Sequence, residues 1–278
     1  MRLFNKVAIV GVGLIGGSIG LAVKKRKLAR LVIGISRHKK TIDSALARKA
    51  IDRGFCDISA VQEADLVILA LPVSSIIQIG RQITVLIKSG ALVTDTGSTK
   101  KELVRGLEKA LPNFVGAHPL AGSEKQGVIN ADGDLFRDSL CVLTPTKKTS
   151  KTALNKIKNF WKALGAEVFY LSPAKHDKYI SYTSHLPHIV AFSLIHSIPR
   201  NTLYLASGGL RDATRIAASG DELWKDIFIT NPENILAALK TFNNSLSRIR
   251  LAIIRRDTKA LVRILRQTRL KRIALDAK

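Results

Sequence analysis

The sequence is poor in cysteine and proline, and both shortages exclude classes of protein. Two cysteines among 278 residues cannot form a disulfide framework. Eight prolines and a hydrophobic fraction of 46% exclude intrinsic disorder for most of the chain, because this much apolar material can bury a core. Cys56 and Cys141 both lie next to apolar residues, so we expect both to be buried, in a reducing, cytoplasmic environment.

Acidic residues are also scarce, with 21 Asp and Glu against 45 Lys and Arg, a net charge of +24. Such an excess raises nucleic acid as a partner, because clustered cations release counterions from phosphate arrays. Here the cations are spread along the chain, and in the basic stretch 248–272 they alternate with apolar residues at helical spacing. We therefore do not expect nucleic acid as a partner, and a general attraction for small polyanions is the milder consequence.

The chain also lacks a long hydrophobic run. The uncharged segment 7–23 follows a basic start and imitates a signal peptide, but it has no small-residue cleavage site and is shorter than the roughly 20 residues of a membrane span. Its regularly spaced glycines have a different explanation, given below. No membrane association is expected.

The first half of the chain alternates short apolar runs with helix-period segments, which indicates a parallel, doubly wound α/β sheet. The expected strands are 6–10, 31–35, 66–71, 91–94 and 114–117, and the expected helices are 41–50, 74–87 and 99–111. Two more strands, 140–144 and 167–170, bracket a helix at 152–164 and should extend the sheet. Helices and loops alone are expected after Ser172-Pro173, so we place one domain at 1–171 and a helical domain at 172–278.

A glycine motif follows the first expected strand and opens a helix, which is the context of a dinucleotide-binding loop. The motif consists of Gly11, Gly13, Leu14, Ile15 and Gly16, with Val12 between the first two glycines. Gly11 permits a tight turn, Gly13 lets the backbone approach a pyrophosphate, and Gly16 lets the helix pack closely on the strand. The sequence therefore predicts a bound nicotinamide dinucleotide.

The end of the second strand predicts which dinucleotide is preferred. An acidic residue at this position would bind the ribose of NAD, but the chain has Ser36 followed by Arg37 and further cations. Because no carboxylate repels a 2′-phosphate and cations can receive it, NADP is the better fit, with NAD as the alternative. A merely solvated basic turn is the other interpretation of Arg37.

Two segments, 95–100 and 116–124, stand at the carboxyl ends of strands, where such sheets bind ligands. His118 in the second segment could take a hydroxyl proton beside a nicotinamide, or could simply be bonded to backbone. In the helical half, His185 and His188 lie three apart, and Arg211 and Arg215 lie four apart on one face. No cysteine or carboxylate cluster completes a metal site with the two histidines, so no metal is expected.

Taken in order, the motifs resemble those of the prephenate/arogenate dehydrogenases of tyrosine biosynthesis. The motifs are GVGLIGGS, DTGSTK, GAHPLAGSEKQG, the His176-Asp177 pair, SHLPH and RDATRIAASGDELW, and they extend over nearly the whole chain. The resemblance implies an N-terminal Rossmann-type domain, an all-helical C-terminal domain that forms a homodimer, and an active site between them. The fold class is then α/β with a helical dimerisation domain.

The resemblance also implies the chemistry, an oxidative decarboxylation of a small-molecule substrate, prephenate, to 4-hydroxyphenylpyruvate. Hydride passes to the nicotinamide while carbon dioxide leaves and the ring becomes aromatic. By similarity, His118 accepts the hydroxyl proton, and Ser98 orients His118 and touches that hydroxyl. The resemblance assigns the substrate-binding residues as Arg215, which meets a carboxylate, His185 and His188, which line the pocket, Ser123 and Glu124 near the entrance, and Trp224 near the dimer partner's site.

Three alternatives stay open. Arogenate dehydrogenase differs in whether the substrate side chain carries an amine, and His188 favours prephenate because some arogenate-specific members lack a histidine there. A β-hydroxyacid dehydrogenase would need a catalytic lysine, either Lys175 or Lys178. A basic nucleic-acid-binding protein that senses a dinucleotide would show salt-dependent binding and no cofactor reduction. Ser36 departs from the acidic residue of NAD-using members, which leaves the cofactor open between NADP and NAD.

Overall fold

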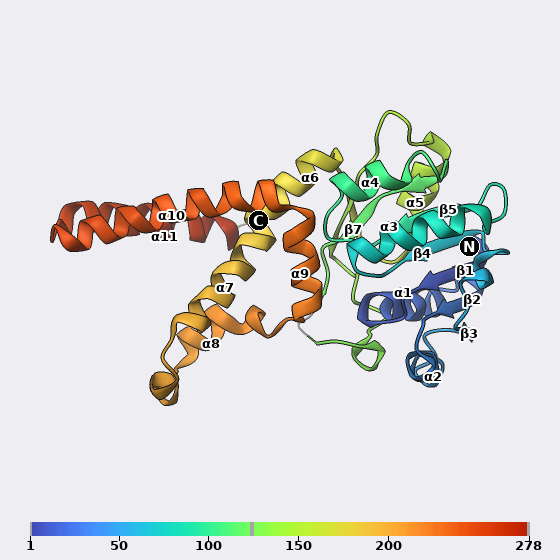
Figure 1. The fold of residues 1–278 in the computed structure, drawn as a ribbon, viewed down its shortest axis with the longest axis horizontal. Helices are drawn as coiled ribbons and strands as arrows, with labels where there is room; N and C mark the ends of the chain where they lie inside the picture. The colour runs from blue at the N-terminus through green and yellow to red at the C-terminus, as the bar shows by residue number, and fades with distance from the viewer. Residues whose placement is uncertain (1, 123–124, 277–278) are drawn as a thin grey trace. The chain divides into compact units, whose positions relative to one another are not determined.

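The computed structural model describes residues 2–122 and 125–276, so the predictions for Ser123 and Glu124 lie outside the described residues. The chain divides into two compact units, Met1–Pro232 and Glu233–Lys278 (Figure 1). The first unit therefore contains the expected sheet and extends beyond the expected boundary at residue 171, to Pro232.

The centre of the first unit is a six-stranded parallel sheet with the strand order β3-β2-β1-β4-β5-β6. Its strands are β1 (Phe4–Val10), β2 (Ala29–Ile35), β3 (Arg53–Phe55), β4 (Leu66–Leu69), β5 (Leu92–Asp95) and β6 (Phe114–Val115). The order reverses between β1 and β4, which is the switch point where doubly wound sheets bind ligands. The predicted parallel sheet is confirmed, whereas the short edge strand β3 was not expected from the sequence.

Alternate residues of the buried strands supply two hydrophobic cores, because successive side chains point to opposite faces. On one face, Val7 and Ile9 pack with helices α1 (Leu14–Lys25), α2 (Lys39–Ala47) and α5 (Lys151–Ala163). On the other face, Ala8 and Val10 pack with α3 (Val73–Gln82), α4 (Lys101–Leu107) and the 3₁₀ turns Ile58–Val61 and Ile83–Val85. Both faces are thus covered, as the near-continuous apolar strands require.

A second, three-stranded sheet contains β7 (Ala117–Pro119), β8 (Leu140–Leu143) and β9 (Glu167–Tyr170), in the order β7-β8-β9. The expectation that 140–144 and 167–170 extend the main sheet is therefore wrong. Gly116 interrupts the expected strand 114–117, and its carbonyl accepts a hydrogen bond from Thr144 N at 2.9 Å. The segment after Gly116 then pairs antiparallel with β8, which starts a separate sheet.

Helices alone follow residue 172 in the described part of the chain, as expected. In the first unit they are α6 (Pro173–Ile180), the π-helix Ser181–His185, α7 (Leu186–Ser197), the 3₁₀ helix Arg200–Leu205, α8 (Gly208–Thr214), the 3₁₀ turn Arg215–Ala218 and α9 (Asp221–Thr230). A further 3₁₀ turn, Val128–Asn130, lies before β8. The Ser172 hydroxyl accepts a hydrogen bond from Lys175 N, and Pro173 stands in the first turn, which together start α6.

Two long helices make up the second unit, α10 (Pro232–Ile254, whose first residue belongs to the first unit) and α11 (Thr258–Asp276). Both expose large apolar side chains, namely Leu236, Leu246, Leu251, Ile253, Ile254, Val262, Leu265, Leu270, Ile273 and Leu275. Basic residues lie between them, as expected for residues 248–272. Among the described residues, no helix is long and apolar enough to cross a bilayer.

The two cysteines differ in environment. Cys141 in β8 is buried as expected, and burial raises the pKa of its thiol far above the usual range. Cys56 is exposed, so the expectation that it is buried is wrong. The physical reason is its place directly after β3, the edge strand of the main sheet, where no element covers it.

Candidate active site

The glycine loop has the geometry of a dinucleotide site. Gly11 has φ +93°, and a Cβ there would lie 2.2 Å from the carbonyl oxygen of Ala70, so both conformation and space require glycine. A Cβ on Gly16 would lie 1.9 Å from the Gly11 carbonyl oxygen, which confirms close packing of helix on loop. A Cβ on Gly13 would meet nothing within 4 Å.

The open side of Gly13 fits a phosphate. Gly13 is the residue before α1, no side chain caps this helix, and its first turn has no acidic residue. Free backbone N–H groups at a helix start and the absence of negative charge both favour an anion. Leu14 and Ile15 form the first turn and are partly exposed. The residues present therefore fit the pyrophosphate of a dinucleotide.

Ser36 and Arg37 follow the end of β2, beside this loop. The carbonyl of Ile35 accepts a hydrogen bond from Gly11 N at 2.8 Å, which holds the two loops together. The Ser36 hydroxyl accepts a hydrogen bond from His38 N at 3.3 Å, and Arg37 is exposed. No carboxylate occupies the first turn of α2 either, since that turn contains Lys39 and Lys40.

His118 lies in the middle of β7 with only 9% of its surface exposed. Its Nδ1 lies 2.8 Å from Nε2 of His176 on α6, within hydrogen-bonding distance. Burial is the main reason that the pKa of His118 lies well below its usual value, and the neighbouring His176 and Lys100 lower it further. His118 is therefore neutral at physiological pH, as a general base must be before it takes a proton.

His176 is in turn bonded to Asp177, the next residue on α6. Nδ1 of His176 lies 2.8 Å from Oδ1 of Asp177. The same carboxylate accepts backbone hydrogen bonds from Lys100 N at 2.7 Å and from Lys101 N at 2.8 Å, at the start of α4. All three side chains of the row, His118, His176 and Asp177, are buried.

A buried ion pair lies under His118. The Lys100 ammonium contacts the Asp95 carboxylate, and both side chains are fully buried. Lys100 Nζ also donates to the carbonyl oxygen of Ala117 at 2.7 Å, while Ala117 N donates to Asp95 Oδ1 at 3.0 Å. Burial lowers the pKa of Lys100, and Asp95 partly offsets this shift. The N–H and the carbonyl of Ala117, immediately before His118, are thus bonded to the end of β5 and to the loop after it.

His185 ends the π-helix between α6 and α7. Pro187 has no N–H and its ring crowds the carbonyl four residues earlier, which explains why the helix widens here. Asn231 Nδ2 donates to the carbonyl of Asp177 at 2.9 Å and lies 3.4 Å from His185 Nδ1. Burial lowers the pKa of His185 to about 4. Its Nε2 is buried without a hydrogen-bond partner among the described residues, which is unusual outside a functional site.

His188, Trp224 and Arg215 lie together in the helical part of the first unit. The rings of His188 and Trp224 stack with centroids 3.6 Å apart and an interplanar angle of 24°. Trp224 also meets the ring of His185 edge-on at 6.2 Å. Burial lowers the pKa of His188, and the positive charge of Arg215 lowers it further, so Arg215 is close enough to act on it.

The structure therefore brings several of the candidate residues together around two histidine pairs, His118 with His176 and His185 with His188. His118 is linked through His176 and Asp177 to Asn231 and His185. Ser98 is half-buried on the loop after β5, but in the described part of the chain the side chain within hydrogen-bonding distance of the His118 ring is His176. The orienting role of Ser98 stays a prediction, as do the roles of Ser123 and Glu124.

Sequence reasoning assigned no role to Asp95, Lys100, His176, Asp177 or Asn231. The first four lie within quoted motifs, so the signal was present, but the contacts of His176 with His118 and of Asp177 with Lys100 join residues 58 and 77 positions apart. No group of three or more His, Cys, Asp or Glu side chains that could hold a metal ion occurs within residues 2–122 and 125–276.

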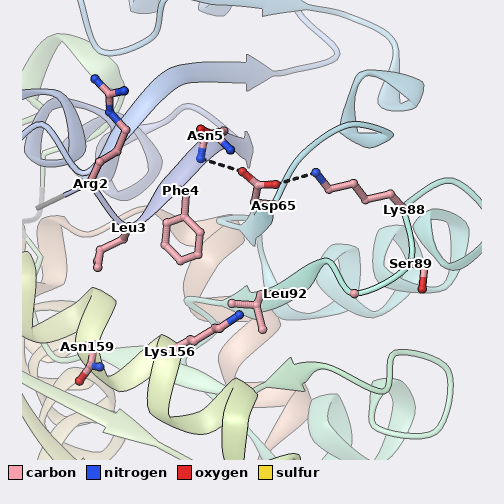
Figure 2. Close-up of a pocket in the computed structure, with 11 residues that line it drawn as sticks. Arg2, Leu3, Phe4, Asn5, Asp65, Lys88, Ser89, Leu92, Lys156 and Asn159 are labelled. Atoms are coloured by element: carbon pink, nitrogen blue, oxygen red, sulfur yellow. Dashed lines mark hydrogen bonds and ion pairs between the residues drawn. The ribbon is translucent and has the colours of Figure 1, made fainter.

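A cavity of about 700 Å³ occurs elsewhere, at the amino-terminal ends of β1 and β5. Figure 2 shows Asp65 in this cavity between the backbone of Asn5 and the ammonium of Lys88, which lies 2.6 Å away. Ligands of doubly wound sheets bind at the carboxyl ends of the strands, which is the opposite edge. The residues around His118 and the glycine loop are therefore the candidate active site.

Comparison with known proteins agrees with this assignment. Residues 19–170 match the family description "Prephenate dehydrogenase, nucleotide-binding domain", and residues 172–267 match "Prephenate dehydrogenase, dimerization domain". A prephenate dehydrogenase of Bacillus subtilis is 38% identical over 94% of this chain and 74% of its own length. A cyclohexadienyl dehydrogenase of Zymomonas mobilis is 34% identical over 99% of this chain and 97% of its own length.

Solved structures show the same similarity. The prephenate dehydrogenase of A. aeolicus, in complex with hydroxyphenyl propionate and NAD+, superposes with a TM-score of 0.92 at 37% identity over 98% of both chains. The arogenate dehydrogenase of Synechocystis superposes with a TM-score of 0.82 at 29% identity over 97% of this chain and 99% of its own. Because the two family descriptions together match most of the sequence, the chain belongs to the prephenate dehydrogenase family.

Proposed function

We propose that the chain converts prephenate to 4-hydroxyphenylpyruvate by oxidative decarboxylation in tyrosine biosynthesis, with a nicotinamide cofactor. The observation that carries the proposal is the buried, neutral His118, whose Nδ1 is taken by His176. Its other ring nitrogen is left to accept a proton from a substrate hydroxyl. Family membership indicates the substrate, prephenate, whose hydroxyl proton this base would accept.

The chain's own residues supply binding and proton transfer. A bound nicotinamide would accept the hydride from the carbon that bears the hydroxyl. His118 takes the hydroxyl proton, and Ser98 contacts the same hydroxyl. Arg215 pairs with a substrate carboxylate, because a planar guanidinium can form two parallel hydrogen bonds with it. His185 donates its unpartnered Nε2–H to the substrate, since Asn231 already faces its Nδ1.

The remaining substrate contacts are proposed on the family resemblance. His188 lines the pocket against Trp224, on which it stacks. The resemblance assigns contacts near the entrance to Ser123 and Glu124. His188 supports prephenate over arogenate. Arogenate is the second candidate, because one relative is described as a cyclohexadienyl dehydrogenase and one solved neighbour as an arogenate dehydrogenase.

NADP is the cofactor we propose in preference to NAD. The support is the exposed Arg37 after Ser36 and the basic first turn of α2, where a 2′-phosphate would meet cations and no carboxylate. The solved A. aeolicus relative contains NAD+, so NAD is the alternative to test.

A homodimer and two functional domains complete the proposal. The match of residues 172–267 to a dimerization domain and the exposed apolar side chains of α10 and α11 support the dimer. A functional boundary at 171/172 coincides with the point where the two family descriptions meet. The cytoplasmic location is proposed from cysteine usage alone.

Steady-state assays of reduced-cofactor absorbance test the proposal, with prephenate or arogenate paired in turn with NAD or NADP. We expect turnover to be greatest with prephenate and NADP. His118→Asn should lower kcat by about 10²–10⁴-fold and leave the Kd of the cofactor nearly unchanged. No turnover with any of the four pairings would refute the proposed activity, and wild-type turnover of His118→Asn would refute the assigned base.

A further inference from the structure

We propose that His176 and Asp177 are positioning residues that hold His118 in the tautomer with a proton on Nδ1 and a free lone pair on Nε2. The proposal rests on the proposed function of His118 as the base. It assigns to this chain a row of three buried side chains, Asp177, His176 and His118, in which the residue that meets substrate is the last.

The row begins at Asp177, whose hydrogen bonds determine which atom donates and which accepts in the rest of the row. Oδ1 accepts from Lys100 N at 2.7 Å, and Oδ2 accepts from Lys101 N at 2.8 Å. With both oxygens engaged by N–H donors, the group acts as a carboxylate, which can only accept hydrogen bonds. The contact of 2.8 Å between Oδ1 and His176 Nδ1 therefore requires the proton to be on the histidine nitrogen.

The same reasoning continues through His176. A neutral imidazole has one N–H donor and one acceptor nitrogen, so a proton on Nδ1 leaves Nε2 of His176 as an acceptor. This Nε2 lies 2.8 Å from Nδ1 of His118, which must then donate. His118 is left with its lone pair on Nε2, the nitrogen that a substrate hydroxyl can meet. The opposite tautomer would place two lone pairs against each other.

Both imidazole rings are neutral before substrate binds, as the pattern of donors and acceptors just described requires. Burial is the main cause that lowers the pKa of His176, and Asp177 offsets part of it. The groups that face the two rings are His185 and Lys100, which disfavour a further positive charge, and Asp95 and Asp177, which favour it. Cys141 on the neighbouring strand is held as a neutral thiol by its raised pKa.

The row also supports the proton transfer itself. When the O–H bond of the substrate breaks, its proton binds Nε2 of His118 and the ring becomes an imidazolium. Its Nδ1–H then donates more strongly to His176, and the Asp177 carboxylate balances the charge one ring away. The arrangement follows the logic of the serine-protease triad, in which a carboxylate orients a histidine without taking its proton.

Nitrogen NMR of the full-length wild-type enzyme, with ¹⁵N-labelled histidine and no substrate, tests the tautomer directly. The chain has six histidines, and the signals of His118 and His176 are assigned by their loss in His118→Asn and His176→Gln. We expect His118 to show a protonated Nδ1 and an unprotonated Nε2 at pH 7. A protonated Nε2 on His118 would overturn the proposal, whatever the activity of the enzyme.

Variants of His176 and Asp177 test the consequence for catalysis. Asp177→Asn removes the negative charge that balances an imidazolium on His118, and an amide nitrogen turned toward His176 would also reverse its tautomer, so we expect kcat/KM to fall by about 10²–10⁴-fold. His176→Leu removes the acceptor and should lower kcat similarly, with KM and the cofactor Kd within about twofold of wild type. His176→Gln should be less impaired than His176→Leu, because its amide oxygen can still accept from His118 Nδ1–H.

Two matched controls separate positioning from stability. His196→Gln changes an exposed histidine on α7, and Asp65→Asn changes a carboxylate that also accepts two backbone hydrogen bonds, from Asn5 and Lys6, far from His118. Both should retain wild-type kcat. If His118→Asn is inactive while folded Asp177→Asn and His176→Leu keep wild-type kcat and pH profile, the positioning role fails and the proposed function stands. If His118→Asn is active, the base assignment fails first.

Discussion

Gly16→Ala should lower the stability of the protein, whereas Gly13→Ala should weaken cofactor binding, although the two glycines stand three residues apart in one loop. The structure gives the reason. A methyl group at Gly16 would lie 1.9 Å from the Gly11 carbonyl oxygen and 3.0 Å from Ile9 Cγ2. At Gly13 the same group would meet nothing within 4 Å. The first substitution therefore strains the fold, and the second occupies the space that we assign to a phosphate.

For Gly16→Ala the cost can be worked out approximately. Overpacking a close contact costs about 1–3 kcal/mol, and a contact with backbone, which cannot rotate away, belongs at the top of this range. Alanine is favoured over glycine inside a helix by about 1 kcal/mol, which offsets part of the strain. We expect the free energy of unfolding to fall by about 2 kcal/mol, as measured by urea denaturation.

Gly13→Ala should leave the free energy of unfolding within about 1 kcal/mol of wild type, since only a helix-capping preference changes. Its methyl group should keep phosphate oxygens from the backbone N–H groups of α1 and weaken cofactor binding at least about tenfold, or about 1.4 kcal/mol. Calorimetric titration with NADP and with NAD measures this loss.

Gly106→Ala in α4 is the matched control, because its Cβ would lie 3.4 Å from Ile77 Cγ2, an ordinary contact. It should change neither cofactor affinity nor stability adversely. Unimpaired cofactor binding by a folded Gly13→Ala would contradict the phosphate site at this loop. A Gly16→Ala enzyme as stable as wild type would contradict the packing argument.

Three further predictions concern cofactor choice, the substrate anchor and acid stability. Arg37→Ala should weaken binding of NADP by about 1.5–3 kcal/mol more than binding of NAD. The control Arg30→Ala, in the strand β2 that precedes Arg37, should change the binding of neither cofactor. Equal effects of Arg37→Ala on both cofactors would refute the assignment of Arg37 to the 2′-phosphate. Arg215→Ala should cost about 2–5 kcal/mol in kcat/KM, and Arg211→Ala less than about 1 kcal/mol; a larger loss at Arg211 would mean that the motif points to the other arginine. Because the folded pKa of His185 is about 4 and the unfolded pKa is about 6.5, the unfolded state binds more protons between these values, so stability is lost as the pH falls through this window. His185→Asn should therefore lose about 2 kcal/mol less than wild type between pH 7 and pH 5 in denaturant titrations, and an equal loss in both proteins would contradict the buried neutral histidine.

The main sheet could be predicted because its strands are buried on both faces and therefore read as apolar runs with glycine-rich or polar ends. The glycine loop was predictable from its spacing after the first strand, and Gly16 contacts the nearby Gly11 and Ile9, although the contact of Gly11 with Ala70 could not be foreseen. The separate sheet of β7, β8 and β9 was not, because the segment 140–144 has the same composition whichever sheet it joins. Cys56 was misjudged because apolar neighbours in sequence do not guarantee a covering element.

His118 could be proposed as the base from the sequence, but the residues that contact it could not. The main chain before His118 is held at Ala117 by the buried Lys100 and Asp95, and the ring of His118 is held by His176. Lys100 and Asp95 are only five residues apart, yet their function depends on a carbonyl 17 residues further along the chain.

A buried lysine–aspartate pair is expensive to desolvate, and its attraction alone does not justify its presence. Here the pair also satisfies both backbone polar groups of Ala117, which would otherwise be buried beside it. Asp177 does the same for the backbone N–H groups of Lys100 and Lys101, so the loop after β5 connects the main-chain support of His118 to its side-chain support. Replacing any of these charged groups should therefore move the base relative to the substrate, because the groups form one connected network rather than separate ion pairs.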